Sequence, residues 1–234
     1  MSGHSKWSTI KHKKGAADAK RGKIFSKIAK EMTIVAKASG GDPSTNPTLR
    51  TLIAKAKAVN MPNDNIDRAI KKGTGELAAD VLEEITYEGY AQGGVGLVVE
   101  VLTDNKNRAA AEVRNIFKKN GSDFASLGSV SRGFERKGTI MIPAAEGVTE
   151  EKVMEVVLTA GADDMESEAD GFTVTCSPAA FSDVCAALET AEIVFDQENS
   201  QVGLVAQTLV PVKELSVAKA VNKFVDALEE HDDV

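Results

Sequence analysis

The spacing of apolar residues differs between the first part of the chain and the rest, and this difference limits the folds that the sequence can adopt. From about residue 16 to residue 73 apolar side chains recur every three or four positions, the period of an amphipathic helix. From about residue 82, Val, Ile and Thr alternate with polar residues in short runs that are typical of strands. Strand-like and helix-like segments then follow one another to the end. We therefore expect a multidomain α+β protein that begins with a helical domain.

Three helices are expected in the N-terminal part. The first covers 16–39 and ends at a Gly-Gly pair, because glycine commonly terminates a helix. The second begins at Pro47 with Asn46 as its N-cap, and a third, short helix ends at Gly73. Together they predict a three-helix domain over 1–76.

The remainder predicts compact α+β units of the split βαβ kind. Strands are expected at 85–90, 95–102, 130–134, 139–142, 172–176, 193–195 and 203–212, and helices after Asn105 and at 150–160, 181–190 and 217–228. An acidic run over 163–170 has no partner base or nucleophile and is expected to be a solvated loop.

Charge is distributed unevenly between these parts. Residues 1–75 contain 16 Lys and Arg against 5 Asp and Glu, a net charge of +11, whereas 76–234 contain 12 against 30, a net charge of −18. Neutralisation of phosphate by Lys and Arg supplies most non-specific affinity for nucleic acid. The asymmetry therefore predicts a polyanionic partner for the N-terminal part. The alternative is that the basic part packs on the acidic remainder of its own chain or is simply solvated.

The expected contacts lie on the first helices and on the segment before them. On the first helix, lysines gather opposite the apolar face, with few acids between them. Before it, Trp7 is expected either to stack on an unpaired base or to pack on the helices. The candidate nucleic-acid-binding residues are Lys6, Trp7, Lys11, His12, Lys13, Lys14, Lys20, Arg21, Lys23, Lys27, Lys30, Lys37, Arg50, Lys55, Lys57, Lys71 and Lys72.

Other classes of protein find little support in the sequence. Cys176 and Cys185 form no C-x-x-C pair, and His4 and His12 lie among lysines, so neither a disulfide nor a metal site is expected. No catalytic constellation or phosphate-binding loop is evident, and we expect no enzyme, no cofactor and no small-molecule substrate. The start lacks an apolar signal segment, and no apolar run reaches the length of a membrane span, which predicts a cytoplasmic protein.

Several segments resemble the signature blocks of the YebC family. They are G-H-S-K-W-S-T-I-K-H-K-K (3–14), D-A-K-R-G-K-I-F-S-K (18–27), G-G-D-P (40–43), N-M-P-N-D-N-I-D-R-A-I-K-K-G-T-G-E (60–76) and Y-E-G-Y (87–90). The family includes the mitochondrial translational activator of cytochrome c oxidase subunit I. One departure is the pair Arg132-Gly133, where many members carry an aromatic and an aliphatic residue after S-V-S.

The resemblance implies three domains, with the third inserted into the second. The expected boundaries are a basic helical domain over 1–76, a discontinuous middle domain over 77–134 and 204–234, and an inserted domain over 135–203. It also implies a probable transcriptional regulator that binds promoter DNA. The alternative is a ribosome-associated translation factor that binds ribosomal RNA and assists elongation. Because lysine outnumbers arginine in the first 75 residues, binding to the backbone is favoured over reading of base sequence.

Overall fold

The computed structural model describes residues 17–78, 81–197 and 199–234, and it confirms the α+β class. Within these residues seven α-helices and two sheets form two compact units. The first unit contains residues 17–25, Gly41–Ile66 and Arg136–Val205. The second contains Ser26–Gly40, Asp67–Glu135 and Ala206–Val234. The domain boundaries expected from the family resemblance differ from the bounds of these two units, and they stay a prediction.

The three expected N-terminal helices are all present. They are α2 (Ala17–Ser39), α3 (Pro47–Ala58) and α4 (Asn63–Thr74). The Asn46 side chain caps α3 by accepting a hydrogen bond of 3.1 Å from the backbone N–H of Leu49, as its position before Pro47 predicts. Gly40 follows α2 with a φ of +88°, a conformation that glycine adopts without steric cost.

Within the second unit, α2 and α4 approach closely at Gly73. A Cβ atom placed on Gly73 would lie 2.4 Å from the carbonyl oxygen of Thr33 and 2.7 Å from the Cβ atom of Ala36. The Thr33 hydroxyl also donates a hydrogen bond of 3.1 Å to the carbonyl of Ala69 on α4. The absence of a side chain at Gly73 therefore allows the two backbones to meet.

Replacement of Gly73 by alanine is expected to lower the free energy of unfolding by about 1–3 kcal/mol, since overpacking forces the backbone to move. The gain in helix propensity, roughly 1 kcal/mol, is too small to offset this clash with backbone atoms. Gly22 of α2 is the control, because it is also a glycine inside a helix and a Cβ atom there meets nothing within 4 Å. Chemical denaturation of both variants measures the difference, and equal stability would contradict the close approach.

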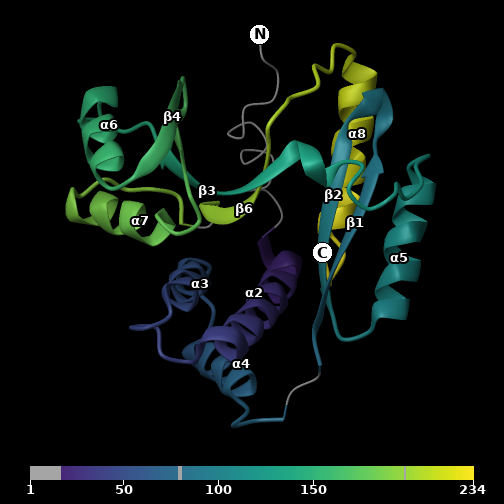
Figure 1. Cartoon of the computed structure of the whole chain (residues 1–234), viewed down its shortest axis with the longest axis horizontal. Coiled ribbons are helices and arrows are strands. Elements are labelled where there is room, and N and C mark those ends of the chain that lie inside the picture. The colour runs from purple at the N-terminus through teal and green to yellow at the C-terminus, as the bar shows by residue number, and fades with distance from the viewer. Residues whose placement is uncertain (1–16, 79–80, 198) are drawn as a thin grey trace. The chain divides into compact units, whose positions relative to one another are not determined.

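The second unit is built around an antiparallel hairpin. Strands β1 (Glu83–Tyr90) and β2 (Gly96–Thr103) pair along their whole length. Helices α5 (Lys106–Lys119) and α8 (Leu215–Glu229) lie beside the hairpin (Figure 1). Phe117 of α5 is fully buried, with its ring centroid 4.9 Å from that of Phe224 on α8 in an edge-to-face arrangement.

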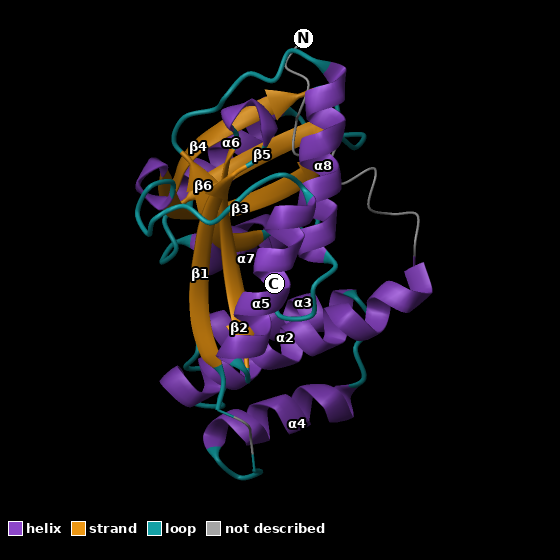
Figure 2. Cartoon of the chain, turned by 90° about the vertical axis from the view of Figure 1, so that its right-hand side faces the viewer, coloured by secondary structure: helices purple, strands orange, loops and turns teal. Residues whose placement is uncertain are grey.

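Besides α3 and the starts of α2 and α4, the first unit contains a four-stranded sheet and two further helices (Figure 2). Its elements are β3 (Phe134–Pro143), α6 (Glu150–Thr159), β4 (Ala162–Glu168), β5 (Gly171–Cys176), α7 (Phe181–Thr190) and β6 (Gln201–Ala206). The strand order is β4-β5-β3-β6, and β3 pairs antiparallel with β5, placing Ile140 opposite Val174. Both side chains are fully buried in a core that includes apolar residues of α6 and α7.

Two segments that were predicted to be strands are not. Residues 130–134 contain a short 3-10 helix, Ser131–Gly133, and β3 begins only at Phe134, because two N–H groups of this segment bond to a buried carboxylate. Residues 193–195 follow α7 instead. Glu192 has a φ of +56°, and the N–H of Ile193 donates to the carbonyl of Leu188, the bonding of a Schellman motif. Ile193 is the apolar residue that closes this helix end.

The acidic run was predicted to be a loop and is largely strand β4. Along this strand Ala162 and Met165 pack on the core, while Asp163, Asp164 and Glu166 are exposed. A register shift between Ala162 and Asp164 interrupts the alternation that identifies a strand in sequence. Charged side chains on an edge strand also oppose pairing with other sheets, which gives the acidic composition a structural reason. The last strand, β6, ends at Ala206 and is shorter than the predicted strand over 203–212.

Candidate nucleic-acid interface

The predicted contacts before α2 lie outside the described residues. These are Lys6, Trp7, Lys11, His12, Lys13 and Lys14. Lys20 and Arg21 lie on the first turns of α2, where the structure describes the backbone. The structure describes the side chains of the other nine predicted residues, from Lys23 to Lys72.

Most of these nine cations are accessible. Lys23, Lys37, Arg50, Lys57 and Lys71 are exposed, and Lys55 and Lys72 are half-buried. Arg50 donates a hydrogen bond of 3.3 Å to the carbonyl of Pro43, and Lys55 donates one of 3.2 Å to the side-chain oxygen of Gln201. Contacts of this length at the surface are weak and leave the cations able to meet a phosphate.

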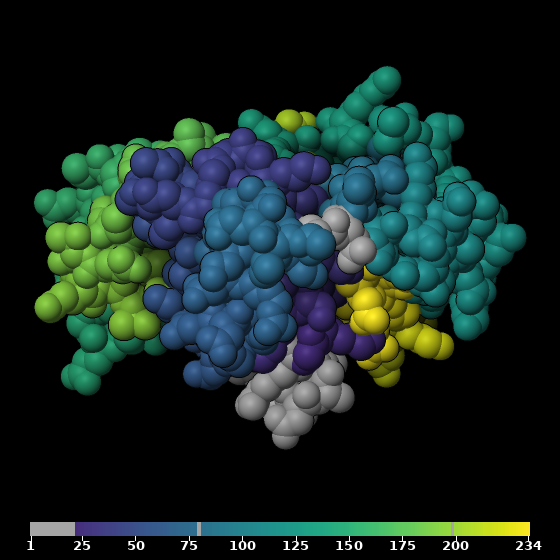
Figure 3. Space-filling view, turned by 90° about the horizontal axis from the view of Figure 1, so that it is seen from below, coloured from purple at the N-terminus to yellow at the C-terminus, as the bar shows by residue number. Residues whose placement is uncertain are grey.

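Lys27 and Lys30 do not belong to a wholly solvated lysine face, which corrects the expectation from the helical projection. The ammonium of Lys27 donates a hydrogen bond of 2.7 Å to the backbone carbonyl of Glu229. The ammonium of Lys30 donates to the carbonyls of Leu102 and Asp232 and lies 2.5 Å from the carboxylate of Asp233. Figure 3 shows the C-terminal residues, in yellow, beside α2. Part of the lysine face therefore contacts the acidic remainder of the chain, as the alternative reading of the charge predicted.

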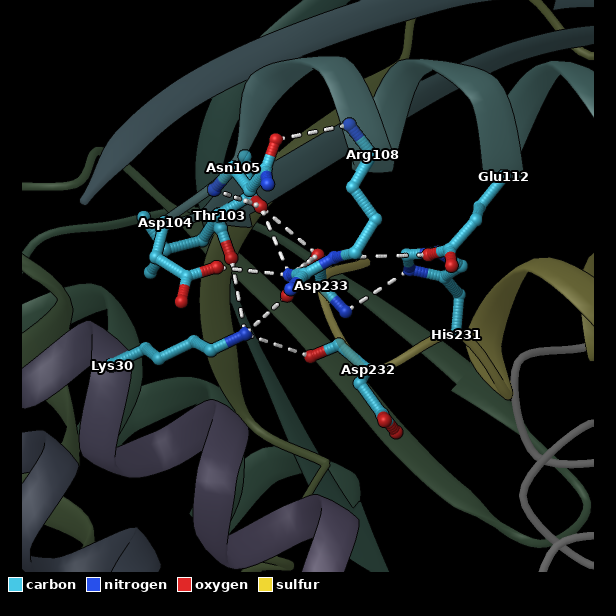
Figure 4. Close-up of polar contacts among 10 residues, drawn as sticks. Lys30, Thr103, Asp104, Asn105, Arg108, Glu112, His231, Asp232 and Asp233 are labelled. Carbon is cyan, nitrogen blue, oxygen red and sulfur yellow. Dashed lines mark hydrogen bonds and ion pairs between the residues drawn. The ribbon is translucent and has the colours of Figure 1, made fainter. Parts of the chain in front are cut away.

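Asp233 is the centre of this contact (Figure 4). Its side chain is 3% exposed and accepts hydrogen bonds from Lys30, from Arg108 at 2.8 Å and from the Thr103 hydroxyl at 3.0 Å. Burial raises the pKa of this carboxyl group, but the hydrogen bonds from Lys30, Arg108 and Thr103 outweigh burial and lower the pKa to about 2. The carboxylate is therefore ionised at neutral pH and joins α2, β2 and α5.

His231 extends the same contact along α5. Its Nδ1 atom accepts a hydrogen bond of 3.1 Å from the backbone N–H of Asp233, and its Nε2 atom lies 2.9 Å from the carboxylate of Glu112. Since Nδ1 accepts, the proton resides on Nε2 and is donated to Glu112. The ring thereby holds the backbone of Asp233 in place (Figure 4).

Two profiles of known protein families match this chain and together cover most of its length. The profile described as "TACO1/YebC protein N-terminal domain" matches residues 5–76, and that described as "TACO1/YebC second and third domain" matches residues 82–234. The chain belongs to the TACO1/YebC family. The resemblance drawn from the sequence blocks is thus confirmed.

TACO1/YebC relatives match over the full length of this chain. A "Probable transcriptional regulatory protein" of Treponema denticola is 56% identical over 234 residues, covering 100% of this chain and 93% of the relative. Proteins also named probable transcriptional regulatory proteins, from Brachyspira hyodysenteriae and Geobacter sulfurreducens, are 52% and 51% identical. Each match covers 100% of this chain and 94% and 93% of the relatives, respectively. A solved structure of a conserved hypothetical protein from Aquifex aeolicus is 42% identical, with a TM-score of 0.86, and covers 98% of this chain and 93% of that one.

The TACO1/YebC block Y-E-G-Y contains a buried carboxylate that the sequence did not single out. Glu88 is 2% exposed. It accepts hydrogen bonds of 2.7 Å from the N–H groups of Gly128 and Val130, and longer ones from the N–H and hydroxyl of Ser131. Burial raises its pKa, but the N–H donors of Gly128, Val130 and Ser131 outweigh burial and lower it to about 2. Glu88 therefore fixes the loop over 128–131. The N–H groups of Gly128, Val130 and Ser131 all donate to this carboxylate, so they are not available to a ligand.

The described part of this TACO1/YebC chain offers no group of three or more His, Cys, Asp and Glu residues placed to hold a metal ion. Burial raises the pKa of the Cys176 thiol to about 11 and that of Cys185 to about 12, so both stay protonated at neutral pH. Among the helices of the described residues, none has the length and apolar content to cross a membrane.

Proposed function

We propose that this chain is a non-enzymatic, cytoplasmic regulator of gene expression that binds the backbone of DNA through α2, α3 and α4. The observation that carries the proposal is the set of exposed cations on these helices within a segment of net charge +11. Its relatives named "Probable transcriptional regulatory protein" support a role in regulation.

The identity of the cations favours phosphate over base edges as the target. Lysine is a compact, strongly hydrated charge, whereas arginine offers the planar fork that reads guanine. Among the exposed cations of α2, α3 and α4, Lys23, Lys37, Lys57 and Lys71 present ammonium groups. We therefore expect affinity that depends strongly on salt and weakly on sequence.

The competing explanation is that these lysines serve their own helices. Lys37, Lys57 and Lys71 lie in the last turns of α2, α3 and α4, where a cation interacts favourably with the helix dipole. That interaction is worth about 0.3–1 kcal/mol at the surface and requires no partner. Only a binding experiment separates the two explanations.

The double charge reversal Lys37→Glu/Lys71→Glu is expected to weaken binding to a 30-base-pair DNA duplex about tenfold or more at moderate salt, because two phosphate contacts become repulsive. Fluorescence anisotropy over a salt series measures the affinity and its salt dependence. The control is Lys219→Glu/Lys223→Glu, an exposed lysine pair on α8 with the same change in net charge. Equal affinities of the two variants would contradict the proposal.

The ribosome remains the second candidate partner, favoured by the charge of −18 over 76–234. An acidic part orients a protein on a phosphate-rich surface by repulsion, leaving the basic helices to make contact. Sedimentation of lysate through sucrose at low salt tests this role. Co-sedimentation with ribosomes that the Lys37→Glu/Lys71→Glu change abolishes would assign the helices to ribosomal RNA, whereas protein that stays at the top would support DNA.

A further inference from the structure

Helix α5 is a second concentration of positive charge, and it lies in the acidic part of the chain. Five of the twelve Lys and Arg residues after Gly75 lie on its fourteen residues, with Glu112 as the one acid among them. The five are Lys106, Arg108, Arg114, Lys118 and Lys119, and all of them are exposed. An ordinary solvated helix mixes both signs of charge, so this composition points to an anionic partner.

One of these five cations already forms ion pairs within the chain. Arg108 bonds to Asp104 and Asp233 and belongs to the contact around Asp233. By contrast, Lys106, Lys118 and Lys119 make no side-chain hydrogen bond or ion pair with any residue that the structure describes. The positive charge available to a partner therefore lies mainly on the C-terminal half of α5.

Arg114 is held in position by aromatic rings. Its guanidinium carbon lies 5.1 Å from the centroid of the Phe124 ring, and that ring stacks on Tyr87 with centroids 4.7 Å apart. A guanidinium placed over a ring loses part of its freedom before any partner arrives, so less entropy is lost on binding. Lys118 follows Arg114 by four positions and lies on the same side of the helix.

The opposite side of α5 explains why this face stays outward. Ala109, Val113 and Phe117 are fully buried against the hairpin and α8. Rotation of the helix would expose these apolar side chains, so the core fixes the direction of Arg114 and Lys118. The carboxylates nearest in sequence are Glu112, which faces His231, and the exposed Asp123.

We propose that the Arg114–Lys118 face of α5 is a second contact for the nucleic-acid backbone, separate from the N-terminal helices. The inference rests on the proposed function and extends it to a bivalent mode of binding. Two linked contacts on one nucleic acid strengthen binding because the second forms within a complex that already exists. A nucleic acid is favoured over an acidic protein because both cationic surfaces of the chain suit the same repeating phosphate.

The test compares Arg114→Glu/Lys118→Glu with Lys219→Glu/Lys223→Glu in the full chain. The two pairs share their spacing, their exposure and their change in net charge, and both helices pack in one core. Binding to a 30-base-pair DNA duplex and to a 30-nucleotide RNA is followed by anisotropy across a salt series. We expect the α5 variant to bind at least one probe about tenfold more weakly, with a salt slope reduced by roughly 2.

The variant Arg114→Gln/Lys118→Gln also loses the Arg114–Phe124 contact, but it removes the two charges without reversing them. The thermal unfolding midpoint of each variant shows whether loss of that contact lowers stability. An intermediate affinity for this variant, with an unchanged midpoint, supports a direct contact. Affinities equal to that of the α8 control overturn the inference while leaving the proposed function intact if Lys37→Glu/Lys71→Glu still weakens binding. Failure of the unaltered chain to bind either probe overturns both.

Discussion

Replacement of Glu88 by alanine is expected to lower the free energy of unfolding by about 3 kcal/mol. The change removes four hydrogen bonds and leaves the N–H groups of Gly128, Val130 and Ser131 without their acceptor. Each buried donor left unsatisfied costs about 1–3 kcal/mol, and entry of water into the vacated space recovers part of this. Denaturant unfolding followed by circular dichroism measures the loss.

Two further variants separate the carboxylate from the volume of the side chain. Glu88→Gln keeps the shape, but its NH2 group presents donors where the loop also presents donors, so most of the loss is expected to remain. Ser131→Ala removes a single hydroxyl donor and is expected to cost about 1 kcal/mol. Hydrogen exchange at the Val130 amide should accelerate in both Glu88 variants. Stability equal to that of the unaltered chain in Glu88→Gln would show that the loop does not depend on the charge.

Replacement of Asp233 by asparagine is expected to cost about 2–4 kcal/mol near neutral pH. The amide cannot balance the charges of Lys30 and Arg108, and removal of one member of a buried pair leaves the others uncompensated. This cost is lower than the roughly 3–5 kcal/mol typical of a fully buried pair, because the Lys30 and Arg108 side chains are 23% and 45% exposed. The exposed Asp226→Asn on α8 is the matched control and is expected to change stability by less than about 0.5 kcal/mol.

The same carboxylate predicts the direction of the pH dependence. The pKa of Asp233 is about 2 in the folded chain, below its ordinary value of 3.8. A depressed folded pKa contributes stability that is fully present above the ordinary value and is lost as the pH falls through the folded value. The difference in stability between the unaltered chain and Asp233→Asn should therefore shrink between about pH 5 and pH 2. A difference independent of pH over this range would contradict the assigned charge.

The periodicity of the sequence predicted the helices well because their apolar faces are continuous. The N-cap at Asn46 and the end at Gly40 combine a local signal with local geometry, so no tertiary information was needed. Strands were harder to predict. At Ile193 an apolar residue closes a helix, and at Asp163 a register shift breaks the alternation of β4, and neither feature has a distinct signature in sequence.

The candidate interface was predicted only in part, for a reason that Lys30 illustrates. A helical projection separates a lysine face from an apolar face, but it carries no information about which distant segment will lie against either face. Asp233 is 203 residues from Lys30, in an acidic C-terminal sequence that is typical of a solvated tail. Glu88 was missed for the same reason, since its donors lie 40 or more residues away.

The most direct test of the account is the dependence of DNA affinity on salt, measured on the unaltered chain with two duplexes of equal length and unrelated sequence. Phosphate contacts through exposed cations of α2, α3 and α4 predict a linear plot of log K against log salt with a slope of about −4 or steeper, nearly equal for both duplexes. A slope near zero, or binding absent at 50 mM salt, would contradict the assignment of these helices to a nucleic-acid backbone.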